Sequence, residues 1–423
     1  MTATATPRRA EVSALASSGL LQIGANATAA VVATFMLGAA GRGEMVLGAT
    51  IGGICAVIGG LGTGQALRSM LPAATAATAA TATAAAAAAD GDRPRLLRSY
   101  AWCSAAGAVG AAGLAIAACA ASAPLLGATL GDTGFFAAVA AFTVVQVIAV
   151  QANEAWYAEG LFRRGGLWFA ATAGGGLAGL LVAAVAEPHA GALLGAQAAG
   201  SALAVAVQLG RLRRAGLLVT GPPSRSAVRA LLARGTPALG LTLGLAVALR
   251  SDRYVLGAFA GPAAVGVYSL AATLSEIPRV VPQAVGQLFI RHVALGGGAR
   301  LSRWVSGSML AAAVGGLLVA AGGWLLIVPV FGEAFEPARS LLLVLVVAEV
   351  CFAPYAVASR GLIGDGRTRA AGAFGLVASV AAIGCYLLGA SLAGSLGLAA
   401  GCVALYCGLS ARAVVLFRHG VPR

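Results

Sequence analysis

Long apolar stretches, separated by short segments with glycine, proline and arginine, form the main pattern along the chain. A helix that crosses the roughly 30 Å hydrocarbon core of a bilayer needs about 20 mostly apolar residues. Closed β-barrels are excluded because the apolar runs are long and do not alternate with polar residues. The pattern therefore predicts an all-α polytopic membrane protein with about 12 transmembrane helices, at residues 14–37, 46–67, 100–126, 135–157, 167–186, 191–209, 238–258, 265–290, 305–328, 341–358, 370–392 and 396–417.

Composition supports this fold class. Hydrophobic residues account for 59% of the 423 residues and charged residues for 10%, and the mean hydropathy is +0.90. A soluble domain carries about 25% charged residues, because its surface contacts water, so a soluble protein is excluded. The seven cysteines lie in apolar stretches without a CxxC or Cys/His cluster, which favours small buried side chains over a metal site or disulfides. No metal or cofactor is expected.

The positive charge indicates how the chain lies in the membrane. All 28 basic residues are arginine, and the formal net charge is +14. If both termini are cytoplasmic, 23 of these arginines fall in inner segments and only Arg42 and Arg339 in outer loops. Because positive residues stay on the cytoplasmic side, we predict a multi-pass protein of the bacterial cytoplasmic membrane with both termini cytoplasmic. The charge is spread over many segments, so no nucleic-acid partner is expected.

The twelve stretches fall into two halves. A polar segment with a Gly-Pro-Pro sequence predicts a cytoplasmic linker at 215–235, ending in a short amphipathic helix, between six-helix bundles at 1–214 and 236–423. The sequence after the fourth stretch (159–165) is similar to that after the tenth (360–366). Because each half has an even number of stretches, such repeats are parallel. Parallel repeats predict alternating access around a central cavity between the bundles.

Ionisable residues inside the membrane usually face a cavity and mark a pathway, because their burial in lipid costs several kcal/mol. The seventh stretch contains Arg250, Asp252 and Arg253, and the two arginines share a helix face because they are three residues apart. Further intramembrane polar residues are Gln22 and Asn26 in the first stretch and Glu349 in the tenth.

The eighth stretch carries a polar stripe. Its residues are spaced 3, 4 and 4 apart, which places them within an arc of about 80° on an α-helix: Glu276, Arg279, Gln283 and Gln287. Pro278 and Pro282 lie between them and predict a kink.

Two interpretations of these charges remain open. In the first interpretation the charges form structural ion pairs, Glu276 with Arg279 and Asp252 with an arginine. In the other, the arginines bind a phosphate-bearing ligand, since guanidinium binds phosphate oxygens bidentately and stays charged. Asp252, Glu276 and Glu349 would then titrate and couple transport to protons or sodium. No catalytic motif is present, and His189, His292 and His419 are scattered, so we expect no enzyme.

Three segments together carry a family resemblance. They are the Gly-Arg-Gly-Glu turn at 41–44, the stretch 250–294 with its Gly-x-Tyr-x-x-Ala and proline, and the Phe-Gly-Glu-Ala-Phe at 331–335 with the later 361–367. In their order and spacing the chain resembles the polysaccharide-exporter and lipid-linked oligosaccharide flippase branch of the multidrug/oligosaccharidyl-lipid/polysaccharide transporter superfamily. The resemblance covers essentially the whole chain.

The resemblance implies two six-helix bundles around a cation-lined cavity, and a flippase or exporter of a lipid-diphosphate-linked polysaccharide unit. The implied partners are the lipid-linked glycan, the bilayer, and a glycan polymerase or glycosyltransferases. Arg250, Arg253 and Arg279 would bind the diphosphate or acidic sugars, and Asp252 and Glu276 would couple the movement. The sibling peptidoglycan-precursor flippases usually place arginine in the first span, which has none here, so another surface glycan is favoured. The alternatives are a cation-coupled multidrug exporter of the same superfamily and a non-transporting scaffold of glycan assembly.

Overall fold

The computed structural model describes residues 9–80, 86–186, 189–294 and 301–419, and every regular element in these ranges is a helix. The predicted all-α class is therefore confirmed. The helices are α1 Arg9–Gly60, α2 Thr63–Ala80, α3 Ala86–Leu126, η1 Ala128–Gly131, α4 Thr133–Ala158, α5 Phe162–Ala186, α6 Ala190–Arg214, α7 Arg225–Ser275, η2 Ile277–Arg279, α8 Val280–Ala294, α9 Leu301–Phe331, η3 Glu333–Phe335, α10 Pro337–Gly364 and α11 Thr368–Arg418.

Nine helical stretches in the described ranges are long and apolar enough to cross a membrane. Three of them have 50 to 66 residues, enough for two crossings each, and each contains a break: Gly38 in α1, Gly261 in α7 and Gly394 in α11. The three glycines have φ between 56° and 76°, a region that glycine enters without the steric cost of a Cβ. The arrangement agrees with twelve crossings in a multi-pass membrane protein.

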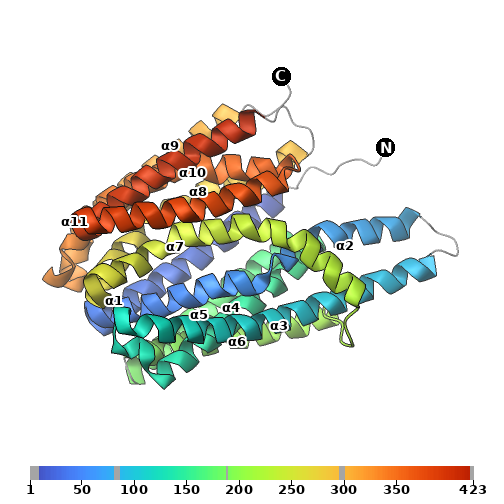
Figure 1. The fold of residues 1–423 in the computed structure, drawn as a ribbon, viewed down its shortest axis with the longest axis horizontal. Helices are drawn as coiled ribbons and strands as arrows, with labels where there is room; N and C mark the ends of the chain where they lie inside the picture. The colour runs from blue at the N-terminus through green and yellow to red at the C-terminus, as the bar shows by residue number, and fades with distance from the viewer. Residues whose placement is uncertain (1–8, 81–85, 187–188, 295–300, 420–423) are drawn as a thin grey trace.

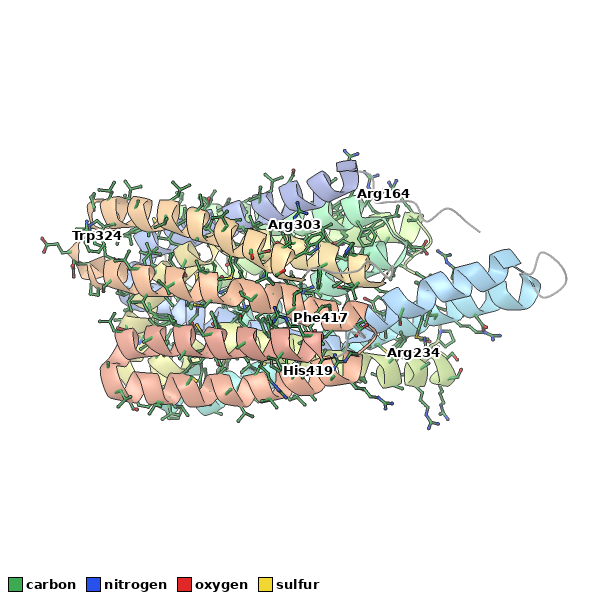
Figure 2. The ribbon with its side chains drawn as sticks, turned by 90° about the horizontal axis from the view of Figure 1, so that it is seen from above. Arg164, Arg234, Arg303, Trp324, Phe417 and His419 are labelled. Atoms are coloured by element: carbon green, nitrogen blue, oxygen red, sulfur yellow. The ribbon has the colours of Figure 1, made fainter. Side chains whose placement is uncertain are left out.

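Helix α1 begins and helix α11 ends at one end of the bundle, and the long helices α1, α7 and α11 each turn back at the other end, at their breaks (Figure 1). We call these the terminal end and the kink end. At the terminal end α2 and the first part of α3 project beyond the other helices (Figure 2). The structure thus agrees with an even number of crossings.

The two halves form two helical bundles that meet along α1 and α7 (Figure 1). At the kink end a Cβ on Gly43 would lie 1.7 Å from the carbonyl oxygen of Pro262, and a Cβ on Gly266 would lie 1.8 Å from that of Ala39. At the terminal end a Cβ on Gly62 would lie 2.1 Å from a backbone oxygen of α7, that of Gly235. Glycine at these positions allows the backbones of the two halves to touch.

Residues 215–224 connect the halves, and α7 begins at Arg225 and continues through residue 235. The expected amphipathic helix is therefore the first part of α7 rather than a separate element. The connection is held against α3, where Trp102 Nε1 donates a hydrogen bond of 2.8 Å to the carbonyl of Gly221. The backbone N–H of Ser224 donates a further hydrogen bond of 3.0 Å to Ser99 Oγ.

Three local expectations need adjustment. The turn after the first stretch is at Gly38, so the predicted turn at 41–44 is helical and Arg42 lies inside α1 instead of in a loop. The second stretch is interrupted at Leu61 and Gly62, which both have positive φ. The kink predicted in the eighth stretch is a full break, where the short 3-10 helix η2 separates α7 from α8. Pro278 and Pro282 explain this break, because neither has an N–H to donate to the helix.

Candidate functional site

A cavity of about 470 Å³ lies between the two halves. Most of its wall comes from the N-terminal half, and α7 with Glu276 supplies the rest. The polar residues in its wall are Gln22, Asn26, Arg42, Thr50, Gln65, Gln146, Gln151, Glu154, Thr172, Gln197, Ser201, Thr242, Arg250, Arg253, Thr273 and Glu276. The expected central cavity is therefore present, and both halves contribute polar side chains to its wall.

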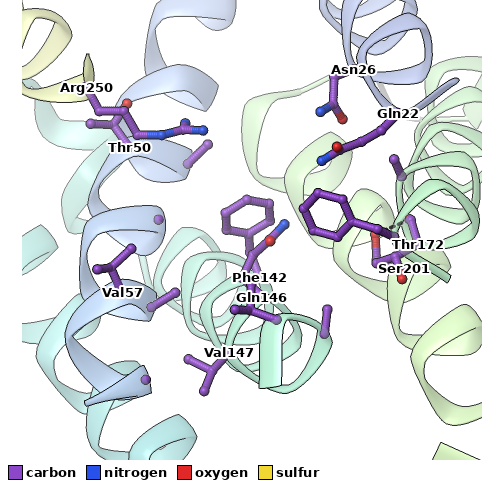
Figure 3. A pocket seen from close by; sticks show the side chains of 18 of the residues that line it. Gln22, Asn26, Thr50, Val57, Phe142, Gln146, Val147, Thr172, Ser201 and Arg250 are labelled. Carbon is purple, nitrogen blue, oxygen red and sulfur yellow. Dashed lines mark hydrogen bonds between the residues drawn. The ribbon is translucent and has the colours of Figure 1, made fainter. Parts of the chain in front are cut away.

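Side-chain amides form the uncharged part of this wall. Gln22 and Asn26 on α1 lie across the cavity from Thr50 and Arg250, and Gln146 lies between the two walls (Figure 3). In the part of the chain that the structure describes, the side-chain amides of Gln22, Asn26, Gln146 and Gln197 make no hydrogen bond. Each amide offers two donor protons and an acceptor oxygen, so the wall can bind a hydroxylated or otherwise polar ligand.

Three guanidinium groups line the cavity toward the kink end. Arg42 is 7% exposed, and its Nε is buried without a hydrogen-bond partner. Arg250 is exposed and, like Arg42, pairs with no carboxylate in the described ranges. Arg253 donates from Nη2 to Glu276 Oε1 at 2.6 Å. Glu276 is thus one carboxylate beside three guanidiniums, which leaves this part of the cavity with positive charge.

Behind this wall, Arg279 and Glu349 form a buried ion pair between η2 and α10. Arg279 Nε donates to Glu349 Oε2 at 2.7 Å, and its Nη2 donates to Glu349 Oε1. The guanidinium also lies 5.1 Å from the ring centroid of Phe352. The pair expected between Glu276 and Arg279 is longer, at 3.9 Å. Neither Arg279 nor Glu349 reaches the cavity wall.

Asp252 points into the C-terminal half. Its Oδ2 accepts a hydrogen bond of 2.8 Å from the hydroxyl of Tyr268, and its Oδ1 accepts one of 2.8 Å from the backbone N–H of Arg253. The side chain is buried and makes no ion pair within the described ranges. The predicted pairing of Asp252 with an arginine is therefore not what holds it.

At the terminal end of the cavity, Glu154 on α4 binds Arg68 on α2. Arg68 Nη2 donates to Glu154 Oε1 at 2.7 Å, and Arg68 Nε donates to the other carboxylate oxygen. The Arg68 guanidinium also stacks over the ring of Tyr157, 4.6 Å from its centroid. The negative charge of Glu154 is therefore already neutralised.

The structure brings together part of the set predicted from sequence. Gln22, Asn26, Arg250, Arg253 and Glu276 line the cavity, whereas Asp252, Arg279, Gln283 and Glu349 do not. The side chain of Gln287 lies outside the part that the structure describes. The break at η2 explains the split of the polar stripe, because its residues do not belong to one continuous α-helix.

Among the wall residues that sequence reasoning missed are Arg42, Gln146 and Gln197. The sequence predicts an outer loop at Arg42, because this residue lies between the first two apolar stretches, 14–37 and 46–67. The two glutamines are intramembrane amides in the fourth and sixth stretches, and this polarity was the signal available in the sequence. No three His, Cys, Asp or Glu side chains in the described ranges gather as metal ligands.

Comparisons with known proteins identify the fold. No family model matches the chain, and no curated protein matches it. Solved structures do: a multidrug resistance MATE family transporter of the MOP superfamily in an outward-facing conformation is 14% identical over 97% of this chain and 94% of its own, with a TM-score of 0.64.

Two further structures agree. A MOP superfamily transporter from Pyrococcus furiosus, described by a reverse polarity of its binding pocket that suggests a different function, is 15% identical over 97% of this chain and 94% of its own, with a TM-score of 0.62. The Vibrio cholerae MATE transporter VcmN in its bent form is 14% identical over 97% and 98% of the two chains, with a TM-score of 0.59. Over nearly its whole length, this chain has the fold of MATE transporters of the MOP superfamily.

Proposed function

We propose that the protein is a membrane transporter that works by alternating access and carries an anionic substrate through the cavity between its halves. The fold, which it shares with MATE transporters over 97% of the chain, supports the transport activity. The observation that carries the choice of an anion is the pair Arg42 and Arg250, two cavity guanidiniums without a carboxylate partner in the described ranges.

The physical reason is the cost of an uncompensated charge away from bulk water. A guanidinium stays protonated in proteins, so it cannot avoid this cost by losing its proton. It is stabilised by an anion that offers oxygen acceptors, and carboxylate and phosphate fit its planar donors. An organic cation would instead need free carboxylates, and both glutamates of the cavity wall are bound to arginine.

The comparisons support the multidrug exporter better than the export of a lipid-linked polysaccharide unit, because two of the similar structures are MATE transporters, one of them a multidrug resistance protein. A volume of about 470 Å³ also lies within the range of about 300–1,000 Å³ that is usual for sites of drug-sized ligands. An exporter of small organic anions is consistent with both the fold and the cavity charge.

Export of a lipid-diphosphate-linked glycan stays a second candidate. The cavity arginines would bind its diphosphate, and the amides of Gln22, Asn26, Gln146 and Gln197 would bind sugar hydroxyls. No similar structure cited above is described as moving such a substrate. In this case Arg250→Ala with Arg253→Ala abolishes export of a surface glycan while the protein still inserts into the membrane.

Coupling is a further part of the proposal. Of the three carboxylates expected to couple transport to protons or sodium, Glu349 is held by two hydrogen bonds from Arg279 and Glu276 by Arg253. Asp252 has only neutral partners, so we assign the coupling role to it. Asp252→Asn is expected to abolish stimulation of transport by an imposed proton or sodium gradient. Stimulation that persists in this variant would exclude Asp252.

The cargo is tested with the purified full-length protein in liposomes. We expect efflux of the anionic dye carboxyfluorescein but not of the cationic dye ethidium, and at least a tenfold loss of carboxyfluorescein efflux in Arg42→Ala with Arg250→Ala. Arg303→Ala is the matched control, because Arg303 is exposed and is not among the residues that line the cavity. Efflux of ethidium alone would contradict the anionic cargo. If neither dye is transported and deletion of the gene causes loss of a surface glycan, the second candidate is favoured. If neither dye is transported and the surface glycan is retained, a non-transporting scaffold is favoured.

A further inference from the structure

Glu276 is placed where a substrate anion would bind. Its side chain lies in the cavity wall and is 33% exposed, whereas Glu349, which binds the neighbouring arginine, is 4% exposed. Its carboxylate accepts the Nη2–H of Arg253 at 2.6 Å. A carboxylate and a phosphate oxygen use the same guanidinium donors, so Glu276 and an incoming anion compete for Arg253.

A second guanidinium lies within reach of the same carboxylate. Glu276 Oε1 is 3.9 Å from Nη1 of Arg279, while Nε and Nη2 of Arg279 are bound by Glu349. A displacement of about 1 Å would bring Glu276 to the usual hydrogen-bond distance from Arg279, about 2.9 Å. Glu276 can therefore leave Arg253 without becoming a buried, unpaired charge.

The backbone at this position accommodates such a movement. Glu276 is the last residue before η2, at the C-terminal end of α7 and two residues before Pro278. Its N–H donates to Ala272, inside α7, so the side chain lies at the edge of a regular helix and not in its middle. A shift of the side chain toward Arg279 therefore breaks no helical hydrogen bond.

We propose that Glu276 is a resident anion of the cavity: it occupies Arg253 until a substrate anion displaces it toward Arg279. This inference rests on the proposed function, an anionic cargo bound at Arg42 and Arg250, and it narrows the substrate class. An anion with one charge binds Arg250 or Arg42 and leaves Glu276 in place. An anion with two or more charges, such as a diphosphate or an organic phosphate, also gains from Arg253 and displaces Glu276.

Binding of inorganic pyrophosphate to the purified full-length protein tests the inference by calorimetry. Glu276→Gln removes the competing charge, so we expect at least tenfold tighter binding of pyrophosphate and less than a twofold change for benzoate, an anion of single charge. The matched control is Glu159→Gln, which removes a carboxylate of similar exposure (25%) from another ion pair, with Arg93, outside the cavity. The control is expected to bind pyrophosphate as the wild type does.

Arg42→Ala with Arg250→Ala separates the two claims. If this double variant loses pyrophosphate binding but Glu276→Gln binds pyrophosphate as the wild type does or more weakly, the role of Glu276 as resident anion is contradicted. The proposal of an anionic cargo is then still supported. Absence of pyrophosphate binding from the wild type and from Glu276→Gln, with benzoate still bound, would overturn the resident anion alone. Absence of binding of both anions would overturn both claims. If Glu276→Gln does not fold, Glu276→Asp replaces it. The shorter side chain of aspartate reaches Arg253 less well, so tighter binding of pyrophosphate than in the wild type is again expected. Equal binding of pyrophosphate would contradict the proposal.

Discussion

The guanidinium of Arg279 is held by both carboxylate oxygens of Glu349, and neither side chain faces the cavity. The two residues are 70 positions apart and join η2 to α10. Arg279 is 9% exposed and Glu349 is 4% exposed. This geometry favours a structural role for the pair, in contrast to Arg250, Arg253 and Glu276 of the same half, which line the cavity.

The first prediction concerns this pair. Glu349→Gln leaves the buried Arg279 with only the more distant Glu276, at 3.9 Å, as a counter-charge. Removal of one partner from a buried ion pair costs about 3–5 kcal/mol. We expect a clear loss of thermal stability, measured by melting of the purified protein in detergent. Arg279→Met combined with Glu349→Leu removes both charges and is expected to restore most of the stability. If the double variant is as unstable as Glu349→Gln, the contribution of the pair to stability goes beyond the mutual neutralisation of its two charges.

The span pattern could be predicted from the sequence because the length of an apolar stretch is a local property. The partners of the charged residues could not. Spacing favours Glu276 with Arg279, since residues three apart share a helix face, but the break at η2 ends that helix. Arg279 instead meets a carboxylate from α10, and this contact depends on the packing of helices far apart in sequence.

Arg42 shows the same limit at the site itself. A short segment with Gly41 and Gly43 predicts a loop, because glycine is common in turns. In the structure these glycines are helical, and Gly43 allows close contact between α1 and α7. The arginine between them is thereby buried in the cavity wall. That role of glycine depends on the neighbouring helix, so the chain pattern alone did not reveal it.

The second prediction concerns the contact between the halves at the kink end. Gly43→Ala would place a Cβ 1.7 Å from the carbonyl oxygen of Pro262, so the two backbones must separate. We expect a longer distance between spin labels on Ala40 and Ala263, measured by pulsed electron paramagnetic resonance. Gly110→Ala, at a helical glycine with open space around it, is the control and should leave the distance unchanged. An unchanged distance in Gly43→Ala would mean that the contact does not hold this end closed.

The third prediction compares two glutamines on α4. Gln151 Nε2 donates to the carbonyl of Gly60 at 2.9 Å and to Thr63 Oγ1 at 3.0 Å, across the break between α1 and α2. Gln151→Met removes both hydrogen bonds: Thr63 Oγ1 loses its donor, and the carbonyl of Gly60 keeps only the hydrogen bond from the Thr63 hydroxyl. We expect this loss to lower the free energy of unfolding by about 1–3 kcal/mol. Gln146→Met, at an amide that makes no hydrogen bond in the described ranges, should change it by less than about 0.5 kcal/mol. Chemical denaturation in detergent measures both, and equal effects would contradict the assignment.

The last prediction links stability to binding at Arg42. Its Nε is buried without a partner, and a buried polar group without a hydrogen bond costs about 1–3 kcal/mol. Arg42→Met keeps an apolar side chain of similar length, so we expect higher thermal stability together with at least tenfold weaker binding of pyrophosphate. Arg303→Met, at an exposed position outside the cavity, should change neither quantity. If Arg42→Met instead lowered the stability and bound pyrophosphate normally, Arg42 would be a packing residue and the anion site would rest on Arg250 and Arg253.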